Sequence, residues 1–267
     1  MPVRRLLPLA DLASTRLHGV RGVLTDIDDT LTRDGAIEPA ALAALQRLRA
    51  AGLPVIAITG RPAGWSEPFA AAWPVAAIVA ENGGVMLRAA PGGVVTDYAQ
   101  DEATRARNDL RLRACAADIL DAVPGARLAA DSAGRRTDIA FDHSEFTQLD
   151  AARIAEIAAL MRAHGLNATV SSIHVNGWIG AHTKWSGAQW AVRHCLAAPL
   201  VPDDWVYVGD STNDQAMFER IPLSVAVANI ERFVPELAVL TAFVTRGERG
   251  AGFAEVADAL LAARSAA

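Results

Sequence analysis

The sequence predicts an α/β fold, in which a parallel sheet with helices on both faces forms a core and a smaller α+β unit is inserted into it. Short apolar runs typical of buried strands alternate with amphipathic helices in both halves of the chain, at residues 20–24, 54–59, 77–80 and 205–210. Residues 86–182 interrupt this alternation. The expected core is therefore residues 1–85 together with residues 183–267, and residues 86–182 are the expected insertion.

The helices of the core have recognisable ends. Pro39 suits the first turn of a helix, and Gly52 is typical of the position just past its end. Thr183 is a suitable N-cap for the helix that begins the second half of the core. The last part of the chain is expected to contain strands at 225–227 and 242–244, a loop at 247–252 and a helix at 253–263.

The insertion is expected to begin with a loop at residues 89–93 and to continue with a long helix from Asp101 to Val123. The predicted buried face of that helix is Leu112, Cys115, Ile119, Leu120 and Val123. The expected elements that follow are a strand at 137–141, a helix at 149–164, and strands at 168–172 and 173–179. The polar residues at the ends of these strands are expected to be solvated surface residues: Arg135, Arg136, His143, His174 and Asn176.

Composition excludes several classes of protein. A net charge of −5 argues against nucleic-acid binding. Cys115 and Cys195 indicate no disulfide framework, which fits a reducing cytoplasm. The apolar run at residues 6–10 is broken by Pro8 and is too short for a secretory signal, and no run reaches the length of a membrane span. We therefore expect a cytoplasmic protein with no membrane partner, and residues 1–19 form an extension to which no function is assigned.

Acidic residues follow the first predicted strand directly. Burying an unpaired carboxylate is costly, so acids at the end of an apolar run need a reason. If the chain stays extended here, Asp26 and Asp28 point to the same side. Two adjacent carboxylates are suitable ligands for a hard cation such as Mg²⁺.

Polar residues also follow the next two predicted strands. The Thr59 hydroxyl and the backbone beside Gly60 are suited to donating to a phosphate oxygen, and Arg61 to pairing with the same anion. Asn82 either contacts the substrate or only forms a tight turn with Gly83.

The segment Asp26-Ile27-Asp28-Asp29-Thr30 resembles the first motif of the haloacid dehalogenase-like superfamily, whose members are mostly phosphohydrolases. The resemblance implies that Asp26 is a nucleophile and Asp28 a general acid/base. Thr59-Gly60-Arg61 resembles the second motif, in which a hydroxyl and a backbone N–H bind the transferred phosphoryl group.

Two further motifs lie in the second half of the chain. The position of Lys184 matches the third motif, in which a lysine balances the charges of the nucleophile and the phosphate. Gly209-Asp210-Ser211-Thr212-Asn213-Asp214 resembles the fourth. There the first acid binds Mg²⁺ and the second supports or completes the metal site, so the implied ligands are Asp26, Asp28, Asp210 and Asp214. Asn213 is expected to bind or orient groups of the phosphate site.

The size and position of the insertion resemble the type IIB cap of Cof-like and sucrose-phosphatase-like members. The resemblance thus implies a Rossmann-like core with an inserted α+β cap domain that closes over the phosphate site. Two positions depart from the family pattern, since Trp185 and Asp29 stand where many relatives have glycine.

The resemblance of these motifs implies a Mg²⁺-dependent phosphatase that acts through an aspartyl-phosphate intermediate. By analogy with capped relatives, the expected partner is a small phosphorylated metabolite, a sugar or polyol phosphate. Two alternatives remain open, a phosphosugar mutase of the phosphomannomutase type and a binding protein that has lost catalysis. The sequence makes no prediction of the oligomeric state.

Overall fold

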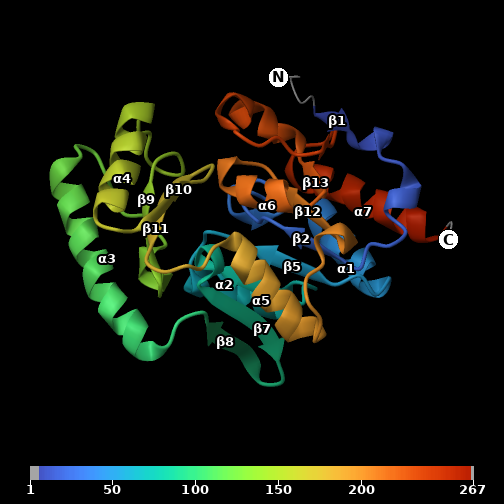
Figure 1. Cartoon of the computed structure of the whole chain (residues 1–267), viewed down its shortest axis with the longest axis horizontal. Helices are drawn as coiled ribbons and strands as arrows, with labels where there is room; N and C mark the ends of the chain where they lie inside the picture. The colour runs from blue at the N-terminus through green and yellow to red at the C-terminus, as the bar shows by residue number, and fades with distance from the viewer. Residues whose placement is uncertain (1–5, 266–267) are drawn as a thin grey trace.

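The computed structural model describes residues 6–265, so the predicted N-terminal extension is described from Leu6 onward. A nine-stranded sheet forms the core, in the order β1-β14-β13-β12-β2-β5-β6-β7-β8 (Figure 1). All neighbours from β1 to β6 are parallel, whereas β7 and β8 are antiparallel. The strands are β1 (Leu7–Pro8), β2 (Gly22–Thr25), β5 (Val55–Ile58), β6 (Ala77–Ala80), β7 (Val85–Ala90), β8 (Gly93–Tyr98), β12 (Trp205–Gly209), β13 (Leu223–Ala226) and β14 (Phe243–Val244).

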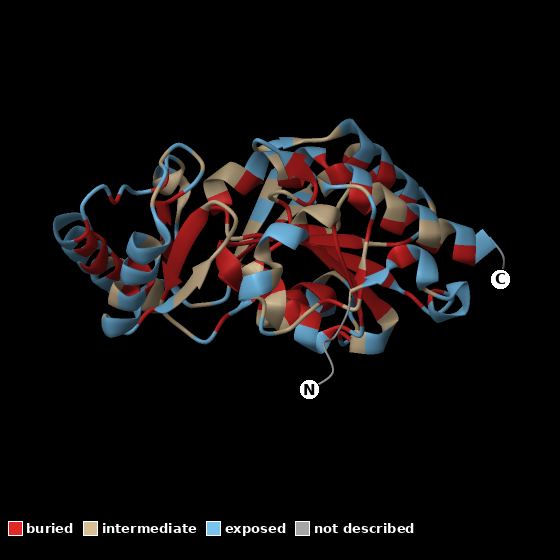
Figure 2. Ribbon diagram, turned by 90° about the horizontal axis from the view of Figure 1, so that it is seen from above, coloured by how far each residue is buried: buried red, intermediate tan, exposed pale blue. Residues whose placement is uncertain are grey.

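Helices cover both faces of this sheet because successive strand residues point to opposite sides. In β2, Val23 belongs to the apolar cluster under one set of helices and Leu24 to the cluster under the other. The first set is α1 (Pro39–Ala50), α2 (Ala63–Ala72) and α7 (Arg249–Ser265), and the second is α5 (Lys184–Leu196) and α6 (Gln215–Arg220). Figure 2 shows the central strands buried between them. The predicted α/β class is confirmed.

The helix ends follow the residues that predicted them. Pro39 is the first residue of α1, and Gly52, just beyond its end, has a left-handed φ of +73°. Thr183 caps α5 in a reciprocal capping box with Ser186. A short ribbon of β3 (Thr32–Arg33) and β4 (Ala36–Ile37) lies between β2 and α1.

A second, smaller unit forms the cap. Its three-stranded antiparallel sheet has the order β10-β11-β9, formed by β9 (Asp138–Asp142), β10 (Asn167–Val170) and β11 (His174–Trp178). Helices α3 (Glu102–Ala122) and α4 (Ala151–Ala163) pack on it around a separate apolar cluster. This unit lies beside the core in Figure 1, as expected for an inserted α+β cap.

The predicted boundary at residue 86 is wrong. Residues 85–98 form β7 and β8, which extend the core sheet, so the cap begins only at the N-cap of α3, Asp101. The loop expected at 89–93 is instead the turn of this hairpin, because Gly92 and Gly93 adopt positive φ there.

The loop expected at residues 247–252 is also shorter than predicted. Helix α7 already begins at Arg249, and the backbone N–H of Gly247 before it donates to the Glu255 carboxylate.

One residue of the predicted buried face of α3 is also wrong. Leu120 is 43% exposed, whereas the preceding residue, Ile119, is fully buried, because successive helix residues point in different directions and only one apolar stripe of α3 faces the sheet. No helix within residues 6–265 has both the length and the apolar character needed to cross a membrane.

Candidate active site

The candidate site lies where neighbouring parallel strands end. Asp26 follows β2 and Asp210 follows β12, its neighbour in the sheet. The backbone N–H of Asp26 donates to Val208 of β12 at 2.8 Å, which fixes the two strand ends together. Thr59 follows β5 on the other side of β2. Polar residues distant in the sequence therefore meet at the edge of an open α/β sheet where ligands usually bind.

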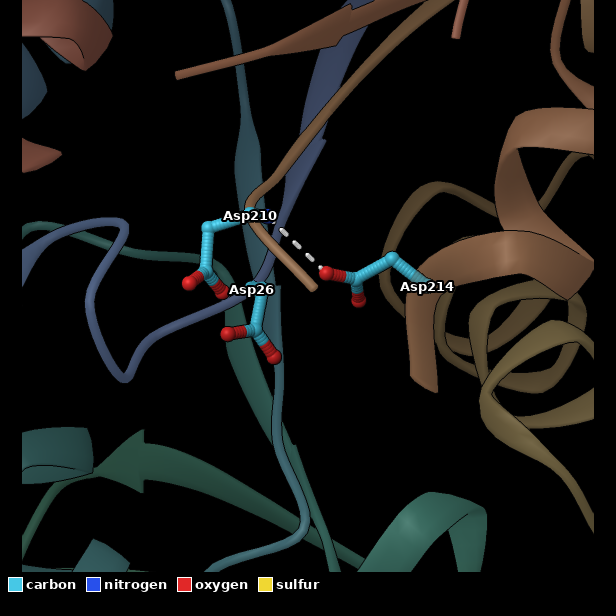
Figure 3. Close-up of side chains that lie close together, drawn as sticks. All are labelled: Asp26, Asp210 and Asp214. Atoms are coloured by element: carbon cyan, nitrogen blue, oxygen red, sulfur yellow. Dashed lines mark hydrogen bonds between the residues drawn. The ribbon is translucent and has the colours of Figure 1, made fainter. Parts of the chain in front are cut away.

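Three carboxylates form a buried cluster at this edge. Asp26, Asp210 and Asp214 each place an oxygen within 4.8 Å of the others, and Asp210 and Asp214 are fully buried. Figure 3 shows them converging, with the Asp210 N–H donating to the Asp214 carboxylate at 3.0 Å. Burial raises the pKa of Asp26 and of Asp210, and the neighbouring acids raise it further.

Lys184 is the cation that balances this cluster. Its Nζ donates to Asp26 at 2.6 Å, to Asp214 at 2.7 Å and to Asn213 at 3.0 Å. Burial lowers the pKa of Lys184, but Asp214 and Asp26 outweigh burial and hold that pKa above its ordinary value. The ammonium is therefore charged, and it opposes the rise in the pKa of Asp26.

Asp214 is held from several directions. One oxygen accepts from Lys184 and from the Tyr207 hydroxyl, and the other accepts from the backbone N–H groups of Asp210 and Ser211. Burial, followed by the charge of Asp214, raises the pKa of Tyr207, which keeps the phenol protonated as a donor. Asp214 is thus suited to supporting the site rather than to holding a cation directly.

The carboxylate oxygens that remain at the site are suitable ligands for a hard cation. The Oδ1 atom of Asp210 is buried and has no hydrogen-bond partner among the described residues, which is costly for a carboxylate oxygen unless a ligand completes it. Asp26 and Asp210 offer hard oxygen ligands of the type that Mg²⁺ prefers.

Asp28 was expected to be a metal ligand, but it is not part of this cluster of carboxylates. The chain leaves the extended conformation after Asp26, because residues 27–30 form a turn in which the Thr30 N–H donates to Ile27 at 3.2 Å. The Asp28 carboxylate instead accepts from Arg61 at 2.9 Å and from the Thr59 hydroxyl at 3.4 Å. The Asp28 side chain is thus held by Arg61 and Thr59, although it lines the same small cavity as Asp26.

Arg61 connects the core to the cap. Besides Asp28, it donates to Asp131 at 3.1 Å and to both oxygens of Glu145, at 2.8 and 3.2 Å. Burial would raise the pKa of Glu145, but hydrogen bonds from His174 and Arg61 lower it to about 2. No sequence pattern marks Asp131 or Glu145, because only the packing of the cap on the core brings them to Arg61.

Four cap residues expected on the surface are buried or lie at this interface instead. Arg135 donates to the carbonyl of Gly60 at 3.1 Å, and His143 is buried. His174 and Asn176 are buried, His174 against Glu145 at 2.9 Å and Asn176 against the carbonyl of Gly60 at 3.1 Å. Both line a small cavity with Asp26, Asp28 and Asn213. The sequence pattern of β11 gave no sign that the core covers the face on which they lie.

The other predicted contacts lie around the same edge. Asn82 is buried, and its side-chain amide has no partner among residues 6–265, although its φ of +55° is also that of a turn. Asn213 accepts from Lys184 and, at 3.1 Å, from Ser211. A larger cavity of about 300 Å³ opens beside Asp28, between Arg61 and the exposed Phe146 of the cap.

Comparison with known proteins gives the same fold. The family model of haloacid dehalogenase-like hydrolases matches residues 23–106. Thermoplasma acidophilum protein 0175 is 18% identical with a TM-score of 0.70, and the match covers 91% of this chain and 98% of that one. The sucrose-phosphatase of Synechocystis sp. PCC6803 is 17% identical with a TM-score of 0.64, over 90% and 98%.

A third solved structure is a sugar phosphatase of haloacid dehalogenase subclass IIB, which is 14% identical with a TM-score of 0.60, over 90% and 96% of the two chains. No curated protein matches the sequence. The segment matched by the family model contains the strand ends that carry Asp26 and Thr59, and nearly the whole chain has the fold of these structures. Residues 23–106 thus match the haloacid dehalogenase-like hydrolases, and the chain shares its fold with these solved structures.

Proposed function

We propose that the protein is a Mg²⁺-dependent phosphatase that hydrolyses a small phosphomonoester. The observation that carries the proposal is the contact of Lys184 with Asp26 inside a buried cluster of three acids. A buried carboxylate kept next to a charged ammonium is suited to attacking phosphorus, because the same cation attracts the phosphoryl oxygens.

The proposed chemistry has two displacements at phosphorus. An oxygen of Asp26 attacks, the bond to the leaving oxygen breaks, and Asp28 supplies the proton to the departing alkoxide. Asp28 then accepts a proton from water, which attacks the aspartyl-phosphate and returns Asp26 with inorganic phosphate. Thr59 and Lys184 bind the phosphoryl oxygens throughout.

Asp26 and Asp210 would hold the cation, with Asp214 and Asn213 supporting them through Lys184. Mg²⁺ bound there would supply positive charge to the phosphoryl oxygens as negative charge develops on them. The carboxylate of Asp28 is left out of this ligand set because it is paired with Arg61.

A sugar or polyol phosphate is the proposed substrate class. The cavity beside Asp28 is large enough for a small leaving group, and its walls include the hydroxyl-bearing residues Thr32, Ser144 and Ser172. Two of the compared structures are a sucrose-phosphatase and a sugar phosphatase by name. The two cysteines are free, in keeping with the proposed cytoplasmic location.

The test is phosphate release from p-nitrophenyl phosphate and from a panel of sugar phosphates, with Mg²⁺ present. Asp26→Asn should lower turnover by roughly 10³-fold or more while thermal unfolding stays cooperative. Asp28→Asn should lower turnover of alkyl phosphates more than that of p-nitrophenyl phosphate, whose leaving group needs no proton.

Two outcomes would contradict the proposal. If the Asp26→Asn enzyme is active, Asp26 is not the nucleophile. Conversion of a sugar 1-phosphate to its isomer without phosphate release would indicate a mutase.

A further inference from the structure

Asp29 occupies a backbone position that favours glycine. It has a φ of +55°, in the left-handed region that few residues other than glycine, asparagine and aspartate adopt. Its carboxylate accepts from two arginines at 2.7 Å each, Arg249 at the start of α7 and Arg232 in the 3-10 helix η7 (Ala228–Glu236). The side chain therefore has a partner set that glycine could not provide.

Arg232 is shared between Asp29 and Asp210. The same nitrogen that is 2.7 Å from Asp29 is 3.3 Å from the Oδ2 atom of Asp210. Asn229 donates to that Oδ2 atom at 3.1 Å and to the backbone carbonyl of Asp29 at 3.0 Å. One oxygen of Asp210 is thus occupied by two donors, and only the Oδ1 atom, which has no partner among residues 6–265, remains for a cation.

The positive charge of Arg232 lies next to Asp210, the proposed ligand of a cation. A guanidinium close to a carboxylate lowers the affinity of that carboxylate for a second cation. The Arg232 side chain is 44% exposed, and its contact with Asp29, at 2.7 Å, is shorter than its contact with Asp210, at 3.3 Å. Asp29 is the charge that competes with Asp210 for this guanidinium.

We propose that Asp29 is a positioning residue that competes with Asp210 for Arg232 and so preserves the affinity of Asp210 for Mg²⁺. The inference rests on the proposed cation site. It assigns a role to the aspartate at this position and to Arg232, neither of which touches the reacting atoms.

The proposal differs from a purely structural role in the sign of one effect. If Asp29 and Arg232 only tied η7 to the turn after β2, loss of either side chain would loosen Asp210 and weaken Mg²⁺ binding. If Asp29 instead reduces the effect of the Arg232 charge on Asp210, loss of Asp29 weakens Mg²⁺ binding, whereas loss of Arg232 does not.

The experiment is calorimetric titration of the full chain with Mg²⁺, without substrate. Asp29→Asn keeps a side chain that tolerates positive φ and removes the charge, and we expect the Mg²⁺ Kd to rise roughly three- to tenfold. Arg232→Gln should leave the Kd unchanged or lower it, and the double variant should return within about twofold of the wild type. The shift of the unfolding temperature with Mg²⁺ gives a second readout.

Asp34→Asn is the matched control. Asp34 is an exposed acid at positive φ, and it lines the cavity of about 300 Å³ that Asp29 also lines. Its Kd should stay within about twofold of the wild type. An unchanged Kd in Asp29→Asn, or a weaker one in Arg232→Gln, would overturn the inference and leave the proposed phosphatase intact. A wild-type chain that binds no Mg²⁺ would instead contradict the proposed cation site itself, and this inference with it.

Discussion

Two buried cations flank the candidate site, and they differ in where their partners lie. Lys184 contacts the Asp26 and Asp214 carboxylates and the Asn213 side chain, all of which belong to the core. Arg61 contacts Asp28 in the core but Asp131 and Glu145 in the cap. The first cluster is fixed by the ends of neighbouring strands, whereas the second exists only while the cap lies on the core.

This difference predicts that Lys184 has the larger effect when it is removed. Lys184→Met leaves the Asp26 and Asp214 carboxylates buried without their cation. We expect the free energy of unfolding to fall by about 3 to 5 kcal/mol, measured by urea denaturation at pH 7. Phosphate release should fall by at least roughly 10²-fold, because the pKa of Asp26 loses the influence that lowers it.

Arg193→Met is the control, since Arg193 is exposed on the same helix and its loss should cost less than about 0.5 kcal/mol. A Lys184→Met chain as stable as this control would mean that the buried acids are protonated and do not need the lysine.

The core cluster was predictable because strand ends in a parallel sheet meet at one edge. The strands before Asp26, Thr59 and Asp210 are short apolar runs, and the structure confirms all three within a residue or two. Their order in the sheet makes β2 the neighbour of both β5 and β12. The turn after Asp26 was not predicted, although glycine at the position of Asp29 in many relatives is typical of the left-handed φ that Asp29 adopts.

The cap contacts were not predictable by the same reasoning. Glu145 lies in a loop that the Asp142 carboxylate holds through three backbone N–H groups, those of residues 144, 145 and 146. Nothing in the local sequence says that this loop faces Arg61. That contact depends on how the cap packs on the core, which no periodicity encodes.

The connection between the two units offers a test by pH. His182 lies between β11 of the cap and α5 of the core, 7% exposed, and neither ring nitrogen has a partner among the described residues. Burial lowers the pKa of His182 from 6.5 to about 4. The unfolded chain therefore binds more protons than the folded chain between those two pH values, so stability falls as the pH falls from about 6.5 to about 4.

The expected loss is about 3 kcal/mol over that window, from roughly 1.36 kcal/mol per pKa unit. His182→Gln cannot be protonated, so the difference in unfolding free energy between pH 7 and pH 4.5 should be smaller in this variant than in the wild type. His18→Gln is the control, because His18 is exposed. Equal pH dependence in the wild type and His182→Gln would show that His182 is not buried in this way.

The smallest expected effect concerns Glu145, the cap partner of Arg61. Glu145→Gln keeps the size of the side chain but removes the charge that Arg61 and His174 contact. Arg61 retains Asp28 and Asp131, so we expect a loss of only about 1 kcal/mol, confined to the contact between cap and core. Proteolysis at residues 99–101 and 179–183, which join the units, should become roughly two- to fivefold faster. Glu156→Gln, an exposed acid on α4, should cleave at the wild-type rate. If both variants are cut equally fast, Glu145 does not hold the cap to the core, and the contrast between the two cations fails.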